Sequence, residues 1–168
     1  MKKLVYFIAI TSFFACGAEV KKDNAPSEVK AEAMEESIEV VEEKELIEIK
    51  VAAIGESMSE IAFEPTTLSI PSNTRIKLTL ENKSSAAGML HNFVLVELGS
   101  GAEISSAGIK AGKKNNFVPK DKRVIAYTKI AQIGETITVE FDAPAKGSYH
   151  YICTYPGHIS MVGRLNVE

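Results

Sequence analysis

From residue 46 onward, apolar and polar residues alternate with a period of two, and this feature constrains the fold most strongly. The stretches that alternate in this way are residues 47–51, 76–80, 137–141 and 165–167, and continuous apolar stretches occupy residues 93–96 and 124–127. Such stretches are typical of half-buried and interior strands. Because short polar turns separate them and no helical pattern alternates with them, residues 46–168 are predicted to form an all-β domain, a β-sandwich.

Residues 98–122 break this rhythm, since they are rich in Gly, Ser, Ala and Lys. We interpret them as an insertion with one short helix. A sandwich of this size buries enough apolar surface to be stable without a disulfide.

The N-terminus carries the signature of an exported protein. Lys2 and Lys3 precede an apolar run at residues 4–16, which is too short to span a bilayer. We therefore interpret residues 1–15 as a signal peptide. Cys16, preceded by Ala15, resembles the cysteine of a bacterial lipoprotein box, which becomes the first mature residue and carries the lipid, although Phe13 stands where Leu is usual. The alternative is ordinary cleavage near Ala18, which would leave a soluble periplasmic protein.

Residues 16–45 are acidic and poor in aromatic residues, which favours a flexible linker between a lipid anchor at Cys16 and the folded domain. This organisation predicts a protein of the bacterial periplasm or cell envelope, tethered to the membrane as a lipoprotein and otherwise outside it. The whole chain has a net charge of −3, which argues against nucleic acid as a partner.

The residues that carry chemistry lie near the C-terminus. Cys153, His158 and Met161 occur within nine residues, after one strand and before the last. A loop of that length can turn all three side chains toward one atom. Thiolate, imidazole and thioether together suit copper, and a Cys with two His and a weak axial Met describes a blue-copper site.

Such a site needs a second histidine, and the chain offers His91 and His150. On a strand, His150 is three residues from Cys153 and therefore faces the opposite way. His91 starts the apolar strand at residues 93–96 and can reach the same end of the sandwich as the loop. We assign His91 as the ligand and interpret His150 as a partly exposed strand residue.

Two other interpretations remain open at this point. Thiolate and imidazole also suit zinc, although structural zinc sites mostly use four strong ligands and Met is a poor one. Cys153 could instead be a catalytic nucleophile with His91 or His158 as its base. That interpretation leaves Met161 unexplained.

Three ordered blocks of sequence resemble the cupredoxins, the family of blue copper proteins, and among them the azurins. The blocks are residues 89–95 (MLHNFVL), residues 118–129 (VPKDKRVIAYTK) and residues 153–165 (CTYPGHISMVGRL). The resemblance covers residues 47–168. It implies an eight-stranded Greek-key sandwich with one mononuclear type 1 copper near one end.

The resemblance also implies roles for single residues. His91, Cys153 and His158 would be equatorial ligands of copper, and Met161 would be the axial one. Asn92 and Thr154 would form a hydrogen bond that holds the two ligand loops together.

Four positions depart from the azurin pattern. Leu90 replaces a Gly whose carbonyl oxygen lies near copper, so a weak contact from the Leu90 backbone is in question. Only two residues separate His158 from Met161, one fewer than in azurins. The azurin disulfide cannot form, because Cys153 is a ligand and Cys16 belongs to the signal region. Phe93 replaces the usual Trp.

The function that follows is single-electron transfer by Cu(I)/Cu(II), with no enzymatic activity. We expect electrons to pass through His158, and redox partner proteins such as cytochromes or oxidoreductases to dock on an apolar rim around it. The expected rim residues are Met89, Pro156, Gly157, Ile159 and Val162. The alternative is a copper carrier or storage protein without redox duty. A fragment of a copper enzyme would need further ligands, and only His150 is left over.

Overall fold

The computed structural model describes residues 43–168, so the predicted signal peptide, Cys16 and residues 17–42 of the predicted linker lie outside the described residues. The alternating stretches form the long strands β1 (Leu46–Ile54), β4 (Arg75–Asn82), β7 (Thr136–Asp142) and β9 (Val162–Val167). The continuous apolar stretches form β5 (Val94–Glu97) and β6 (Val124–Tyr127). Strand β8 (Gly147–Ile152) ends directly before Cys153.

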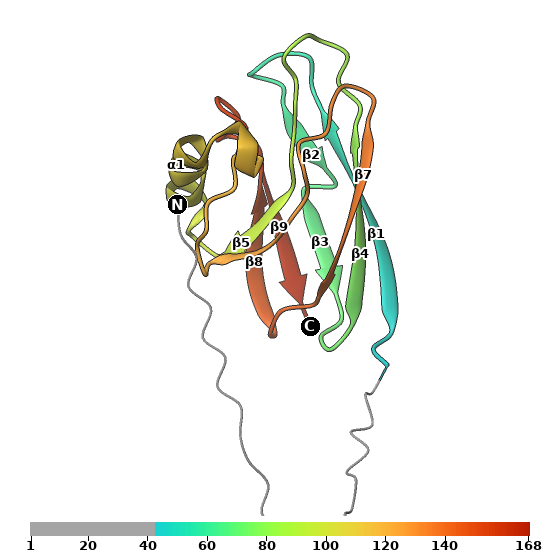
Figure 1. Cartoon of the computed structure of the whole chain (residues 1–168). Coiled ribbons are helices and arrows are strands. Elements are labelled where there is room, and N and C mark those ends of the chain that lie inside the picture. The colour runs from blue at the N-terminus through green and yellow to red at the C-terminus, as the bar shows by residue number, and fades with distance from the viewer. Residues whose placement is uncertain (1–42) are drawn as a thin grey trace, which may run out of the picture. The chain divides into compact units, whose positions relative to one another are not determined.

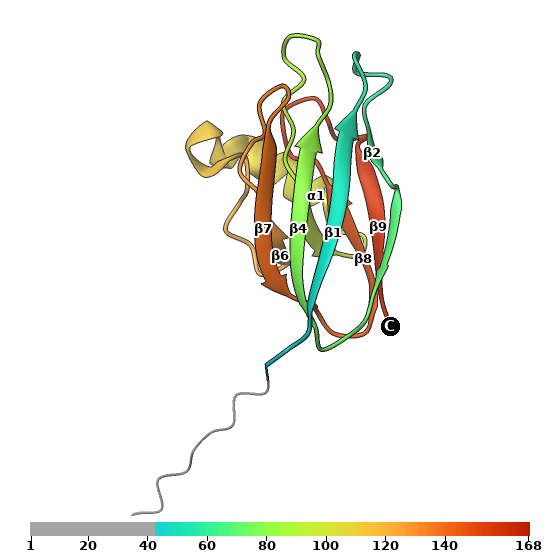
Figure 2. The ribbon, with the colours of Figure 1, turned by 90° about the vertical axis from the view of Figure 1, so that its right-hand side faces the viewer.

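Two sheets pack face to face, and the predicted β-sandwich is confirmed (Figure 1). One sheet has the strand order β2-β1-β4-β7, and the other has the order β3-β9-β8-β5-β6. Strands β1 and β4 are parallel, as are β3 and β9, and the other pairs are antiparallel. The first sheet faces the viewer in Figure 2.

Residues 43–168 contain nine strands, one more than the resemblance implies. The sequence pattern missed β2 (Ala62–Glu64) and β3 (Thr67–Ile70), which have only three and four residues. Strands this short do not show enough alternation to be recognised.

The core between the sheets is built from the apolar residues that alternate inward. Its largest fully buried members are Phe63, Ile76, Leu78, Leu80, Phe93, Leu95, Tyr151 and Leu165. Phe93 stacks on Tyr151 with ring centroids 5.2 Å apart. The smaller side chain at the position of the azurin Trp is thus packed against an aromatic neighbour.

The predicted helical insertion is present as α1 (Gly101–Ala111), followed by a short 3₁₀ turn at Lys113–Asn115. Helix α1 lies against the outer face of the second sheet, where Ile104 packs with Val94, Val96 and Ile152. Its Gly108 approaches the Phe117 carbonyl and Thr154 so closely that a Cβ atom there would collide with the carbonyl oxygen. The insertion is therefore fitted directly onto the loop that follows Cys153. Within residues 43–168, no helix combines the length and apolarity needed to cross a bilayer.

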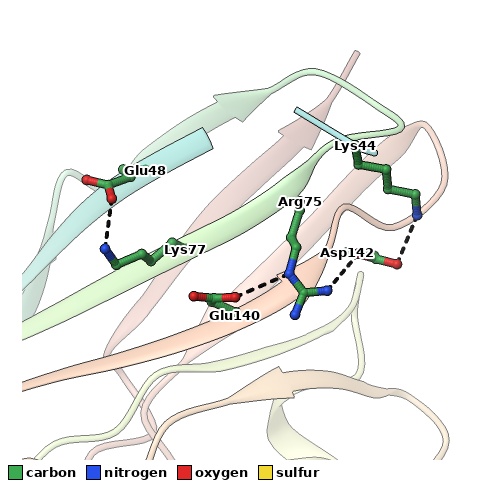
Figure 3. A network of polar contacts seen from close by, with 6 residues as sticks. All are labelled: Lys44, Glu48, Arg75, Lys77, Glu140 and Asp142. Carbon is green, nitrogen blue, oxygen red and sulfur yellow. Dashed lines mark hydrogen bonds and ion pairs between the residues drawn. The ribbon is translucent and has the colours of Figure 1, made fainter. Parts of the chain in front are cut away.

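The outer face of the first sheet carries a row of ion pairs (Figure 3). Lys77 pairs with Glu48 at 2.8 Å, and Arg75 pairs with both Glu140 and Asp142. Lys44 also pairs with Asp142, at 2.9 Å. All of these side chains are at least one third exposed, so their charges are well solvated.

Candidate metal centre

Three chain segments bring His91, Cys153 and His158 together. His91 forms a single β-bridge with Ala131 just before β5, Cys153 directly follows β8, and His158 lies in the loop that leads to β9. Their ligand atoms all lie within 4.8 Å of one another, and all three residues are buried. The structure thus gathers the three residues assigned from sequence and leaves His150 outside the cluster, where it is half-buried on β8 between Val96 and Arg164.

The distances within the cluster fit one metal ion. The Nδ1 atoms of the two histidines are 3.2 Å apart, and the Cys153 Sγ atom lies 3.6 Å from His158 Nδ1 and 3.9 Å from His91 Nδ1. A point equidistant from the three atoms lies about 2.1 Å from each, close to a usual length of bonds from metal to imidazole nitrogen and thiolate sulfur. These residues could hold a single first-row transition metal.

Burial makes all three groups neutral in the metal-free chain. It lowers the pKa of His91 to about 4, with repulsion from His158 as a second cause, and it also lowers the pKa of His158. Burial raises the pKa of the Cys153 thiol to about 11. The imidazoles are therefore ready to bind a cation, while the thiol must release its proton when the metal enters.

The ligand loop is closed by its own backbone. The His158 amide donates to the Tyr155 carbonyl at 3.0 Å, and the Met161 amide donates to the His158 carbonyl at 2.9 Å. The Cys153 amide in turn donates to the Met161 carbonyl at 3.1 Å. Gly157 has a φ of +90°, which L side chains rarely adopt, so the turn before His158 depends on glycine. Met161 is fully buried at the end of this loop.

Asn92 joins the His91 segment to the Cys153 segment. Its Nδ2 atom donates to Thr154 Oγ1 at 2.8 Å, and its Oδ1 atom accepts from the Thr154 amide at 2.8 Å. The same Nδ2 atom donates to the Asn116 carbonyl of the insertion at 2.9 Å. The hydrogen bond expected between Asn92 and Thr154 is present, and it extends to a third segment that was not foreseen.

Sequence reasoning missed two residues that hold the His91 segment. Asn82 is fully buried and donates to the carbonyl oxygens of Met89 and Ala131, and its own Oδ1 accepts from the Ser84 amide. Ser84 Oγ lies 3.4 Å from His91 Nε2. The signal was available, because Asn82 continues the buried phase of Ile76, Leu78 and Leu80 on β4. An amide at an apolar position of a strand requires buried partners.

Glu56 fastens the loop before His91 from outside. Its carboxylate accepts hydrogen bonds from the Ser85 amide and hydroxyl and from the Ala86 amide. These bonds, the one from the Ser85 backbone first, hold the pKa of Glu56 below its ordinary value. The loop is thereby anchored to the segment after β1.

The apolar surface over His158 differs from expectation in one residue. Ile159 and Val162 are 57% and 41% exposed, and Pro156 and Gly157 are exposed as well. Met89 is only 9% exposed and belongs to the core, so its placement on the rim is wrong. The exposed Met58 takes its place, because its methyl carbon fills the space beside Gly157. We use the term apolar rim for Met58, Pro156, Gly157, Ile159 and Val162.

Known proteins resemble this chain in sequence. The family described as copper binding proteins, plastocyanin/azurin family, matches residues 47–168. Auracyanin-A of Chloroflexus aurantiacus is 40% identical over 119 residues, which cover 68% of this chain and 72% of that protein. Azurin iso-2 of Methylomonas sp. strain J is 37% identical over 122 residues, which cover 68% of this chain and 92% of that protein.

Solved structures of related proteins resemble this chain in fold as well as in sequence. The structure of auracyanin A, described as a "blue" copper protein, is 36% identical and superimposes with a TM-score of 0.67 over 73% of this chain and 99% of that one. Dithionite-reduced auracyanin of Roseiflexus castenholzii is 34% identical, with a TM-score of 0.64 over 72% of this chain and 96% of that one.

Proposed function

Because this chain belongs to the plastocyanin/azurin family of copper-binding proteins, we propose that it is an exported carrier of single electrons and not an enzyme. Copper is its cofactor, and His91, Cys153 and His158 form the site for one copper ion. The observation that carries the proposal is the convergence of two neutral imidazoles and one thiol, all buried, on a single point. A thiol with a pKa raised to about 11 is a poor nucleophile, which weighs against a catalytic cysteine.

Bound copper would supply a one-electron couple between Cu(I) and Cu(II). The chain would contribute a cage whose shape changes little on transfer. Asn92 and Thr154 tie the two ligand segments together, and burial of all three ligand residues excludes water. A cage fixed by hydrogen bonds limits the structural rearrangement that each transfer requires.

We propose that the thioether of Met161 would be a further, weak ligand of the bound copper. This residue is fully buried, and its backbone bonds to both His158 and Cys153 place it at the closure of the ligand loop. The Leu90 carbonyl, next to His91 in the chain, would be the candidate for a further weak contact with the bound copper.

Electrons would enter and leave through His158. Its ring is 1% exposed, but Gly157 and Ile159 on either side are exposed parts of the apolar rim. The rim would dock redox partner proteins such as cytochromes or oxidoreductases, since such encounters use small interfaces.

Export and anchoring rest on the sequence alone. We propose that residues 1–15 are removed and that Cys16 carries a lipid, which would tether the protein in the periplasm or cell envelope. In a native-like host the protein should fractionate with membranes, and Cys16→Ser should release it or stall its processing. Wild-type protein that is wholly soluble and cleaved near Ala18 would refute the anchor and leave the copper site untouched.

Two measurements test the electron-transfer proposal. The oxidised, copper-loaded protein should show an intense visible band from Cu(II)–thiolate charge transfer. Electron self-exchange should be fast in the wild type and markedly slower in Ile159→Lys, since two like charges would meet across the interface, and the effect should ease as salt rises. A blue protein whose self-exchange is slow and insensitive to Ile159→Lys would instead favour a copper carrier or store.

A further inference from the structure

The insertion beside the metal centre concentrates positive charge. Residues 101–132 contain seven basic and two acidic residues, whereas residues 43–100 and 133–168 together contain seven basic and twelve acidic ones. Both acidic residues of the insertion, Glu103 and Asp121, pair with Arg123. Six exposed lysines remain, and within the described part of the chain they form no ion pair: Lys110, Lys113, Lys114, Lys120, Lys122 and Lys129.

Two of these lysines border the ligand segments, and two more line a neighbouring hollow. Lys113 and Lys129 line a hollow together with Leu90, which precedes His91, and Tyr155, which lies between Cys153 and His158. Lys114 and Lys120 line the adjoining hollow. We use the term basic surface for Lys113, Lys114, Lys120 and Lys129.

The basic surface is fixed to the metal centre. Asn116 lines both hollows, and its carbonyl oxygen accepts a hydrogen bond from Asn92, which also binds Thr154. Phe117 packs edge-on against Tyr155, with ring centroids 5.4 Å apart. The lysines are therefore carried by segments whose position is set by the ligand loop itself.

We propose that the basic surface steers and docks redox partner proteins whose electron-exchange site is bordered by carboxylates. The inference rests on the proposed electron-transfer function and adds the charge of the partner to it. One electron passes between this chain's copper and the one-electron centre of the partner, and no bond is made or broken. Unpaired lysines beside an apolar contact area raise the rate of encounter with an acidic surface and disfavour a basic one.

A protein partner fits this placement better than an anionic membrane does. Lys113 and Lys129 border Leu90 and Tyr155, which lie next to the metal ligands, so a membrane held there would obstruct the approach of any redox partner. A partner protein with carboxylates around its redox centre would be attracted by the same lysines, which would bring its redox centre close to the metal centre of this chain.

The test compares two triple variants with the same change in charge. Lys113→Glu, Lys114→Glu and Lys129→Glu alter the basic surface, while Lys50→Glu, Lys146→Glu and Arg164→Glu alter exposed residues on β1, the β7–β8 turn and β9. Stopped-flow kinetics would use a strongly acidic and a strongly basic monohaem cytochrome c as probes. At low ionic strength the basic-surface variant should react about tenfold more slowly with the acidic probe and faster with the basic one. The control variant should change much less, and high salt should abolish the difference.

A copper-free titration separates this inference from the electron-transfer proposal. Adding the acidic cytochrome to the isotope-labelled, copper-free full chain should shift the amide resonances of residues 113–118, 120 and 129, and the basic-surface variant should lose these shifts. If the wild type exchanges electrons with neither cytochrome, the electron-transfer proposal fails, and the copper-free titration still decides whether the surface binds. Equal effects of the two triple variants would overturn the inference. So would lysine-dependent binding to phosphatidylglycerol vesicles together with unchanged binding of the cytochrome.

Discussion

The metal centre and the outer face of the first sheet use polar groups in opposite ways. Around the centre, Asn82, Asn92 and Thr154 are buried, and each bonds to neighbours that water cannot reach. On the outer face, Lys77, Glu48, Arg75 and their partners form charged pairs at equally short distances, but in solvent (Figure 3). Charged pairs thus lie in solvent, where they contribute little to the free energy of unfolding. Uncharged hydrogen bonds lie in the interior, where loss of one partner lowers that free energy considerably.

The largest effect is expected from Cys153→Ala. Removing the only thiol of the described chain should abolish the charge-transfer band completely, because no other group there can supply the thiolate. Circular dichroism should still report a folded sandwich, since the core is built mainly from apolar side chains other than the ligands. His150→Ala is the matched control and should keep the colour. A Cys153→Ala protein that stays blue, or a His150→Ala protein that loses its colour, would mean that the ligands are wrongly assigned.

Asn92→Ala should have the next largest effect. It deletes two buried hydrogen bonds and one partly buried one, and it leaves polar groups of Thr154 and Asn116 without partners, which should lower the free energy of unfolding by about 2–4 kcal/mol. Urea unfolding of the copper-free protein measures this, and copper affinity should fall as well. Asn115→Ala, which removes one exposed bond to the Ala111 carbonyl, should be nearly silent. Equal losses in the free energy of unfolding of the two variants would contradict the contrast between buried and exposed hydrogen bonds.

Gly108→Ala tests the contact between α1 and the ligand loop. The added methyl group would meet the Phe117 carbonyl and crowd Thr154, so the helix must shift. Overpacking of this kind should destabilise the protein by about 1–3 kcal/mol and perturb the visible spectrum through Thr154. Ser106→Ala, at an exposed position of the same helix, is the control. A Gly108→Ala spectrum identical to the wild type would show that the helix is not coupled to the site.

Lys77→Ala should produce almost no change at neutral pH. The pair with Glu48 is exposed on both sides, so solvent already screens most of the attraction. The midpoint of thermal unfolding should stay close to that of the wild type, and added salt should not separate the two proteins further. A clear loss of stability would mean that ion pairs on the outer face contribute to the stability of the fold as much as the buried hydrogen bonds do.

The remaining effect of that pair should depend on pH in a defined direction. Lys77, first through its hydrogen bond and then through its charge, holds the pKa of Glu48 below its ordinary value of 4.5. A lowered folded-state pKa adds stability above the ordinary pKa, and this stability is lost as the pH falls through the folded value. Unfolding curves of the wild type and Lys77→Ala should therefore converge in acid. If the two unfolding curves diverged in acid, the direction assigned to the pKa shift of Glu48 would be wrong.

Alternation along the chain was sufficient to predict the long strands, because a half-buried strand repeats its environment every two residues. Cys153 and His158 were predicted as metal ligands because they are crowded with Met161 into one short loop, and the structure brings His91 to the same point. The role of Met161 stays a prediction. Strands β2 and β3 are held by their neighbours β1 and β9, so their own sequence carries little signal.

The residues around the site that were misplaced or missed have a common physical cause: contacts between segments distant in the sequence determine their positions. Met58 reaches Gly157 from a segment almost one hundred positions away, and no local pattern encodes that contact. Met89 was expected on the surface, but the Asn82 side chain binds the Met89 carbonyl and draws this part of the loop into the core. Asn82 itself could have been found, since a buried amide on β4 implies loops folded against it.

Both ends of the described domain lie far from the metal centre. Strand β1 begins at Leu46, opposite Arg75, and the Ser72 amide donates to the Glu168 carbonyl, so both ends lie at the same end of the sandwich (Figures 1 and 2). Cys153 instead follows the opposite end of β8, at Ile152. A nine-residue strand separates the two ends of the sandwich by about 30 Å. An affinity tag, a fused enzyme or a gold-binding peptide attached at either end of the described domain would therefore leave the metal centre and the apolar rim uncovered. Immobilised on an electrode in this way, the domain would present the apolar rim to dissolved partners rather than to the metal surface.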